Sequence, residues 1–305
     1  MAKKTLTIVS VTGSQAYAQG AVYSIETSFL ELQHKISHIE CLLISPERPY
    51  YCPSYIKHIP CKPFSYLEYN LFMLYGLGQF INTDFCLVVQ NDGWVINGNN
   101  WKDDFFNYDY IGAPVPDLIE VVNNQYVRRF DIDFWQKHKD NLPPNIYESQ
   151  NGGFSLRSRK LLNAPRALGL SLEISNFESF QQIPLEMKWN FNSDIRHAED
   201  SYLSCIKRQI LMHHGIKFAP RNIAAQFSVE YLPIQKIENI PLDSLFGCHF
   251  SSLLTLIGSK KVQVNVNIYS LNDFSTNKLL NLLSTYNYEF IVPTEFNKIN
   301  FNRNA

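Results

Sequence analysis

The sequence predicts an α/β fold in which a mixed, mostly parallel central sheet carries helices on both faces. Through the first hundred residues, short β-rich runs alternate with segments of helical spacing, which is the pattern of layered α/β domains. The run Phe85–Val89 is apolar throughout, as is typical of a central strand that is covered on both sides. A chain of 305 residues is long enough for one large core with a small additional unit.

The first predicted strand and helix are joined by a short polar loop. Leu6–Val11 is a β-rich run, and Thr12, Gly13 and Ser14 follow it directly. Apolar residues then recur at helical spacing along Ala21–His38. The chain therefore begins with a predicted unit of strand, loop and helix.

A second strand is predicted at Cys41–Ser45, where Pro46 ends it. The following stretch, residues 46–63, is rich in Pro, Tyr and Cys, which favours irregular structure with one short strand. Leucines then recur in register along Tyr66–Phe80, and this spacing predicts a helix that leads into the central strand.

Beyond residue 100 the alternation of predicted strands and helices becomes less regular, and segments rich in aromatic residues and proline follow. A clear helix is predicted at Glu199–His214, because Gly215 follows it as a common helix terminator. From residue 259 onward the chain is rich in Asn and Lys, with one Leu-rich helical stretch at Leu279–Leu283. We therefore expect a main domain at residues 1–258 and a small C-terminal annex at residues 259–305 that packs on it.

The composition excludes several classes of protein. A hydrophobic share of 45% and an aromatic share of 14% are too high for a disordered chain. The formal net charge of −1 argues against nucleic acid as a partner.

No run approaches the ~20 apolar residues that cross a bilayer, and the chain starts on a β-like run rather than a signal segment. We expect a cytoplasmic protein with at most peripheral association with the inner face of the membrane. The six cysteines contain no Cys-x-x-Cys pair, so structural thiols are expected.

Polar groups follow the central strand directly, in the order Gln90, Asn91, Asp92 and Gly93. Open α/β sheets bind ligands at the carboxyl ends of their strands, and a carboxylate there suits a divalent cation that bridges phosphates. The alternative is a tight turn, because Asp-Gly is a common hairpin signal. The spacing alone supports both interpretations equally.

Three weaker signals lie further along the chain. Gly152 and Gly153 would let the backbone pass close to a ligand, although a plain turn or bulge is the simpler interpretation. Glu199 and Asp200 stand at the start of a helix, where the macrodipole helps to keep a carboxylate ionised, but either could be a simple N-cap. His249, taken alone, is better explained as a core or surface histidine than as a ligand.

Taken in order, these motifs resemble a family of uncharacterised glycosyltransferase-like domains within the GT-A superfamily of nucleotide-sugar transferases. The resemblance is carried by six separated motifs, which are Val88–Gly93, Tyr108–Pro114, Asn151–Ser158, Glu199–Asp200, Phe227–Glu230 and Phe246–His249. It spans roughly residues 5 to 250 and implies a GT-A-like, Rossmann-like fold.

The resemblance also implies roles for individual residues. Asp92 would be the metal-binding acid of an Asp-x-Asp element whose first Asp is replaced by Gln90, and His249 would be the second metal ligand. Mn²⁺ or Mg²⁺ is the implied cofactor, and the missing Asp puts strict metal dependence in doubt. Asp200 and Glu199 would be the catalytic carboxylates. By the resemblance, Gly152 and Gly153 would lie beside the donor sugar. The other expected donor-binding residues are Thr12, Gly13, Ser14, Gln90, Asn91 and Asp92, because the loops after the first and fourth strands share one edge of a parallel sheet.

The implied reaction moves a hexose from a nucleotide-diphosphate donor, UDP by resemblance, to a hydroxyl of a glycan or lipid-linked glycan during surface polysaccharide synthesis. With Asp200 as the base, the displacement would invert the anomeric centre, although a retaining enzyme of the same fold would use this acid to position the acceptor. Two alternatives keep the same site. One is a carbohydrate- or nucleotide-binding protein without turnover, and the other is a hydrolase of nucleotide sugars.

Overall fold

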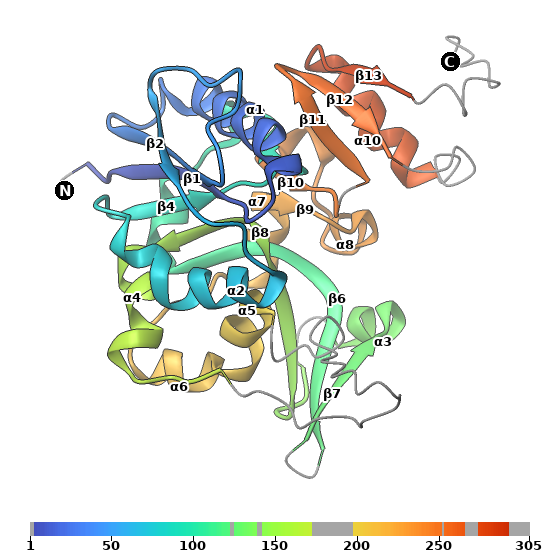
Figure 1. Ribbon diagram of the computed structural model, residues 1–305. Helices are drawn as coiled ribbons and strands as arrows, with labels where there is room; N and C mark the ends of the chain where they lie inside the picture. The colour runs from blue at the N-terminus through green and yellow to red at the C-terminus, as the bar shows by residue number, and fades with distance from the viewer. Residues whose placement is uncertain are drawn as a thin grey trace, which may run out of the picture.

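A seven-stranded sheet in the order β3-β2-β1-β4-β8-β6-β7 forms the centre of the molecule (Figure 1). The computed structural model describes residues 3–122, 125–138, 142–172, 198–251, 253–265 and 274–292. The strands are β1 (Leu6–Val11), β2 (Ile39–Ser45), β3 (Ile56–Pro60), β4 (Phe85–Val88), β6 (Tyr110–Val122), β7 (Gln125–Phe130) and β8 (Ile146–Ser158). The first four pair in parallel, and β7 and β8 run against the other five. The predicted α/β class with a mixed sheet is confirmed.

Helices cover both faces of this sheet, as the sequence predicts (Figure 1). One face carries α1 (Gln15–Leu32) and α7 (Arg221–Phe227), and the other carries α2 (Tyr66–Leu71), α4 (Arg159–Ala167), α5 (Glu199–Ser201) and α6 (Arg208–His213). The remaining α-helices are α3 (Ile132–Lys137), α8 (Leu232–Ile237) and α10 (Phe274–Thr285). Short 3-10 helices occupy Leu77–Gln79, Gly98–Asn100, Asp103–Asn107 and Leu242–Ser244.

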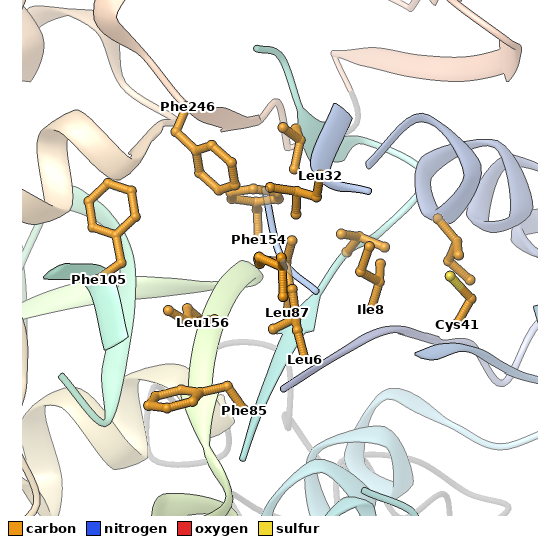
Figure 2. Close-up of a cluster of buried hydrophobic side chains, with 14 of the residues drawn as sticks. Leu6, Ile8, Leu32, Cys41, Phe85, Leu87, Phe105, Phe154, Leu156 and Phe246 are labelled. Carbon is orange, nitrogen blue, oxygen red and sulfur yellow. The ribbon is translucent and has the colours of Figure 1, made fainter. Parts of the chain in front are cut away.

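The alternation of side chains along β1 explains why this strand is apolar at almost every position. Leu6 and Ile8 point into the cluster beneath α1, whereas Val9 and Val11 pack on the opposite face against Met73. Figure 2 shows the α1-side cluster, in which strand residues meet aromatic rings from later segments. The two clusters hold the carboxyl ends of β1 and β4 side by side.

Two predicted helices are broken by π turns. The stretch Tyr66–Phe80 contains α2, then a π turn at Phe72–Gly76, and then a 3-10 turn. The single helix expected at Glu199–His214 is wrong in detail, because a π turn at Tyr202–Ile206 separates α5 from α6. Lys207 lies outside the helical region at φ −104 and ψ 6, so the second segment restarts there. A π turn inserts one residue into the helical repeat, which hydrophobic spacing does not reveal.

The boundaries of the first helix also differ from the prediction. α1 spans Gln15–Leu32 rather than Ala21–His38. The chain is already helical after Ser14, which has extended geometry at φ −117, and residues 33–38 form turns before β2 starts at Ile39. Propensity does not separate a helix from the turn that follows it when no Gly or Pro marks the end.

A second sheet of three short strands lies beside the end of β4. It contains β5 (Gly93–Val95), β10 (Gly247–His249) and β9 (Ser228–Val229), in that order. His249 pairs with Gly93 across the antiparallel β5 and β10. The pairing brings the late histidine to the turn that ends the central strand.

The C-terminal region forms a third sheet, with β11 (Leu254–Gly258), β12 (Lys261–Val264) and β13 (Glu289–Ile291) packed against α10 (Figure 1). The expected boundary between residues 258 and 259 falls in the turn of the β11–β12 hairpin. The indole of Trp94 in β5 donates a hydrogen bond of 2.9 Å to Tyr288, so this region shares a core with the second sheet. The division into two units stays a prediction.

Two further observations concern the chain as far as it is described. None of its helices combines the length and the apolar character that a bilayer span requires. Among the described residues, no disulfide joins any of the six cysteines, and four of the thiols are buried. The thiols therefore contribute to the core as small apolar groups.

Candidate functional site

A cleft of about 370 Å³ opens at the carboxyl ends of β1 and β4. Its floor combines two predicted donor-binding segments, Thr12–Ser14 and Gln90–Asp92, and its walls carry the aromatic side chains of Tyr17, Phe64, Tyr66 and Tyr69. The two segments meet because β1 and β4 are parallel neighbours in the sheet. The tertiary structure thus brings six of the predicted donor-binding residues into one cleft.

The segment after β4 is a tight turn. Gln90 and Gly93 exchange two backbone hydrogen bonds of 3.2 and 2.9 Å, which leaves Asn91 and Asp92 at the tip. The carbonyl of Asp92 accepts a hydrogen bond from the Phe250 amide at 2.8 Å. The turn interpretation of Asp-Gly is therefore correct, and the same turn places the Asp92 side chain at the cleft.

His249 lies at the centre of a buried polar cluster. Its Nε2 is 3.5 Å from Oδ1 of Asp92 and 3.4 Å from Oε1 of Gln90, and its Nδ1 is 3.5 Å from Oε1 of Glu230. Burial alone would lower the pKa of His249, but Glu230, Asp92 and Asp200 together raise it to about 9. The imidazole therefore carries a proton at neutral pH in the protein by itself.

These donor atoms fit a divalent cation that shares its coordination shell with substrate. Two ligand atoms that bind one ion at right angles, with bonds of about 2.0–2.6 Å, lie about 2.8–3.7 Å apart. The distances from Nε2 of His249 to Oδ1 of Asp92 and to Oε1 of Gln90 fall within that range. Across the described ranges, no cluster of three or more His, Cys, Asp or Glu side chains is arranged to hold a metal. Asp92 and His249 are the described residues that would hold the ion at this position.

Gly152 and Gly153 lie in a bulge of β8. Between the pairs Gly112–Ser155 and Pro114–Gln150, β6 advances by two residues while β8 advances by five. Asn151 Oδ1 stabilises the bulge by accepting hydrogen bonds from the amides of Gly153 and Phe154, at 2.7 and 3.2 Å. The bulge interpretation is correct.

Each glycine of the bulge lies against a different group of site residues, with no space for a side chain of its own. A Cβ atom on Gly153 would lie 2.3 Å from Nε2 of His249 and 2.7 Å from Oε1 of Gln90. A Cβ atom on Gly152 would lie 2.4 Å from Oε1 of Glu199 and 2.9 Å from Cβ of Asp200. The bulge therefore stands between the histidine cluster and the two acids, in contact with both.

Asp200 is held against the bulge by backbone amides. Its Oδ2 accepts a hydrogen bond of 3.0 Å from the amide of Gly152, and its Oδ1 accepts one of 2.6 Å from Ser201. Burial and the neighbouring charge of Glu199 raise the pKa of Asp200 to about 6, although the two amides act in the opposite direction. This carboxylate is still largely ionised at neutral pH, and the contribution expected from the helix start stays a prediction.

Glu199 is buried in an ion pair with Arg157, whose side chain is fully enclosed. The guanidinium donates to both carboxylate oxygens of Glu199, at 2.7 and 2.8 Å, and also to the carbonyl of Gly152 at 3.1 Å. A bidentate pair of this kind fixes both partners. Glu199 therefore braces the bulge through Arg157, whereas Asp200 is held by the backbone amides of Gly152 and Ser201.

The N-cap interpretation of these acids is wrong. The N-cap of α5 is Ala198, so Glu199 and Asp200 both lie inside the first turn. The amide of Glu199 donates a hydrogen bond of 2.8 Å to Oδ1 of Asn70 in α2. This contact links the acids to the helix beside the cleft.

Sequence reasoning assigned no role to several residues that build the site. These are Arg157, Glu230, Asn70 and Tyr69. The hydroxyl of Tyr69 accepts a hydrogen bond of 2.8 Å from the side-chain Nε2 of Gln90. Asn70 is a polar residue within a leucine stripe, and Arg157 and Glu230 lie in two of the motifs that carry the resemblance. Their roles depend on contacts between segments distant in sequence.

We expect Gly153→Ala to damage the cleft without unfolding the protein. The new methyl group collides with His249 and Gln90, so overpacking should cost about 1–3 kcal/mol of unfolding free energy. Displacement of His249 should also weaken binding of a nucleotide diphosphate with manganese, measured by calorimetry. Gly258→Ala is the matched control, because its Cβ would meet nothing closer than 3.3 Å. Equal effects of the two substitutions would contradict this account of Gly153.

Comparison with known proteins gives one family and two solved structures. The family described as "Protein of unknown function (DUF5672)" matches residues 56–249. A crystal structure of galactosyltransferase LgtC with donor and acceptor sugar analogues is 11% identical, with 92% of this chain and 95% of that chain covered and a TM-score of 0.43. An active-site mutant of LgtC is 10% identical at the same coverage, with a TM-score of 0.40. A search among curated proteins finds no match.

Proposed function

Since this chain belongs to the family of unknown function DUF5672, we propose its activity from the geometry of the cleft: transfer of a hexose from a nucleotide-diphosphate donor to a hydroxyl of a glycan acceptor. One observation carries the proposal. The bulge at Gly152 and Gly153 touches Asp92's partner His249 on one side and Asp200 on the other. A phosphate-binding group and a candidate base therefore stand on either side of one short segment.

A positive charge near the phosphates would favour departure of the nucleotide diphosphate. When the bond between the sugar and the diphosphate breaks, negative charge builds up on the phosphate oxygens, and a fixed positive charge lowers the barrier. A divalent cation held by Asp92 and His249 would supply this charge when bound. Thr12, Gly13 and Ser14 line the same cleft and would contact the nucleotide.

Asp200 is the proposed base for the attacking hydroxyl. Two backbone amides fix its orientation, and a pKa of about 6 keeps it ionised at neutral pH while leaving it more basic than an ordinary aspartate. Attack assisted by this base would displace the diphosphate from the opposite face of the sugar and invert its configuration. UDP as the nucleotide, a hexose as the sugar and surface polysaccharide as the product rest on the resemblance of the motifs.

Product analysis with a panel of nucleotide sugars tests the proposal against both alternatives. A transferase releases nucleotide diphosphate when an acceptor is present and builds a new glycosidic bond. A nucleotide-sugar hydrolase would release free sugar with water as the acceptor. A binding protein would retain the donor intact, and that result across the whole panel of donors and acceptors would overturn the proposal.

We expect Asp92→Asn to weaken binding of a nucleotide diphosphate in manganese far more than binding of the bare nucleoside. The carboxylate contacts the nucleoside only through the ion, and loss even of an outer-shell partner costs about 10–100-fold in metal affinity. Calorimetry with and without manganese measures the difference. Asn91→Asp adds a charge at the neighbouring position and serves as the matched control. If the metal changes neither wild type nor variant, Asp92 is a turn residue without a metal.

A further inference from the structure

One short segment, residues 64–70, connects the two ends of the candidate site. At one end the Phe64 amide donates a hydrogen bond of 3.3 Å to the carbonyl of Gly13, in the first donor-binding loop. At the other end Oδ1 of Asn70 accepts a hydrogen bond of 2.8 Å from the amide of Glu199. Figure 1 shows the result, with α2 beside α5. The segment therefore leads from the proposed nucleotide loop to the two acids.

Tyr66 lies at the acid end of this segment. Its carbonyl accepts a hydrogen bond of 2.7 Å from Nδ2 of Asn70, so the same amide side chain joins it to Glu199 in α5. Its ring stacks on that of Tyr69, with centroids 6.3 Å apart and an angle of 15° between the planes. The hydroxyl of Tyr69 is bonded in turn to the side chain of Gln90. Tyr66 is thus tied both to the end of the central strand and to the acids.

The start of α2 fixes the position of Tyr66. Ser65 is the N-cap, and its hydroxyl accepts a hydrogen bond of 3.3 Å from the amide of Glu68. The Glu68 carboxylate accepts one of 2.6 Å from the amide of Ser65, which completes a capping box. Tyr66 is the first residue of the helix, so its backbone is held in place before any ligand binds.

The Tyr66 side chain presents both an apolar and a polar group to the cleft. It lines the cleft and is 52% exposed. Burial around the hydroxyl and the charge of Asp200 raise its pKa to about 12, although the Asn70 side chain acts in the opposite direction. The hydroxyl therefore keeps its proton at neutral pH and can donate a hydrogen bond. A hexose offers matching chemistry, with C–H groups on the faces of its ring and hydroxyls at the edge.

We propose that Tyr66 determines which donor sugar the cleft accepts, through contact of its ring and hydroxyl with the hexose. The inference rests on the proposed function, in which Thr12–Ser14 contact the nucleotide and Asp92 lies at the diphosphate. The diphosphate joins the nucleoside to the sugar, so the sugar lies on the side of Asp92 away from that loop. Tyr66 is on this side because its contacts lead to the acids, whereas Phe64 stays beside the nucleotide loop.

Calorimetry that compares UDP with a panel of UDP-hexoses, all in Mg²⁺, tests the inference. Tyr66→Ala should weaken binding of the preferred UDP-hexose about 10–100-fold, because an aromatic contact is lost. Binding of UDP should stay unchanged, because UDP carries no sugar. Tyr66→Phe keeps the ring and should cost about 3–10-fold through loss of one hydrogen bond. Saturation-transfer NMR should show weaker signals from hexose protons, relative to uracil protons, in Tyr66→Ala than in wild type.

Tyr17→Ala is the matched control. Tyr17 lines the same cleft and is 55% exposed, but it lies in the first turn of α1, directly after the nucleotide loop. Its loss should change the affinities for UDP and for UDP-hexose by the same factor. All three variants should unfold at nearly the wild-type temperature, because the substituted side chains lie at the surface.

Two results would overturn the inference. Equal weakening of UDP and UDP-hexose by Tyr66→Ala would place this side chain at the nucleotide, and unchanged affinity for both would remove it from the ligand. Failure of the proposed function has a different signature, because calorimetry needs no acceptor. A loss in Tyr66→Ala that depends on the sugar, together with no new glycosidic bond in product analysis, would defeat the transfer reaction and leave this role of Tyr66 standing.

Discussion

Asp200→Asn should remove most turnover while leaving donor affinity close to that of wild type. Asparagine keeps an oxygen that can accept the hydrogen bond from the Gly152 amide, but it cannot take a proton from an acceptor hydroxyl. Loss of acid–base catalysis typically costs about 10²–10⁴-fold in rate. Steady-state kinetics with an acceptor identified by product analysis measures the loss.

The pH dependence provides a second readout of the same residue. Because the base must be deprotonated to act, turnover should rise with pH through about 6, the pKa of Asp200 in the protein. Glu199→Gln should move this profile to lower pH, because the charge of Glu199 contributes to raising the Asp200 pKa. An Asp200→Asn protein with unchanged turnover would sink the proposed mechanism and leave this carboxylate as a structural group.

Arg157→Met should lower the free energy of unfolding by about 3–5 kcal/mol. The substitution leaves Glu199 buried without the guanidinium that now contacts both of its oxygens, and an isolated buried charge is strongly unfavourable. Denaturant unfolding at neutral pH measures the loss. A change below about 1 kcal/mol would show that the pair does not brace the site.

The pH dependence of this stability loss distinguishes an isolated buried charge on Glu199 from a simple loss of packing. Without Arg157, an ionised Glu199 is buried without its partner in the folded protein but is hydrated in the unfolded chain, so ionisation of this carboxyl favours unfolding. The deficit should therefore grow as pH rises and shrink as it falls toward about 4. Adding Glu199→Leu to Arg157→Met removes the isolated charge and should recover part of the loss. A deficit that does not vary with pH would indicate a packing defect instead.

Local patterns predicted the central sheet better than the helices. The apolar runs of β1, β2 and β4 are buried on both sides, so their composition alone marks them as strands. Helix limits were less visible, since neither the start of α1 at Gln15 nor the π turn at Tyr202–Ile206 changes the apolar pattern. The interruption matters because it follows directly on Glu199 and Asp200.

The residue types of the candidate site were also predictable, but their grouping was not. Asp92, Asp200 and His249 carry chemistry that is recognisable in sequence, and the polar segment after β4 pointed to one sheet edge. The contact of His249 with Glu230 requires a parallel β9 beside β10, and neither short strand is long enough to show a pattern.

The sequence by itself determined the α/β class, the strands that form the cleft floor and the identity of the acids, because these follow from local hydrophobic pattern and side-chain chemistry. Tertiary structure decided which partners surround each acid. Arg157 closes on Glu199 from a strand more than forty residues earlier, while Gly152 leaves Asp200 beside the bulge with two amide donors. Two adjacent carboxylates have the same propensities in sequence, and their different roles arise from the partners that the folded chain brings to each.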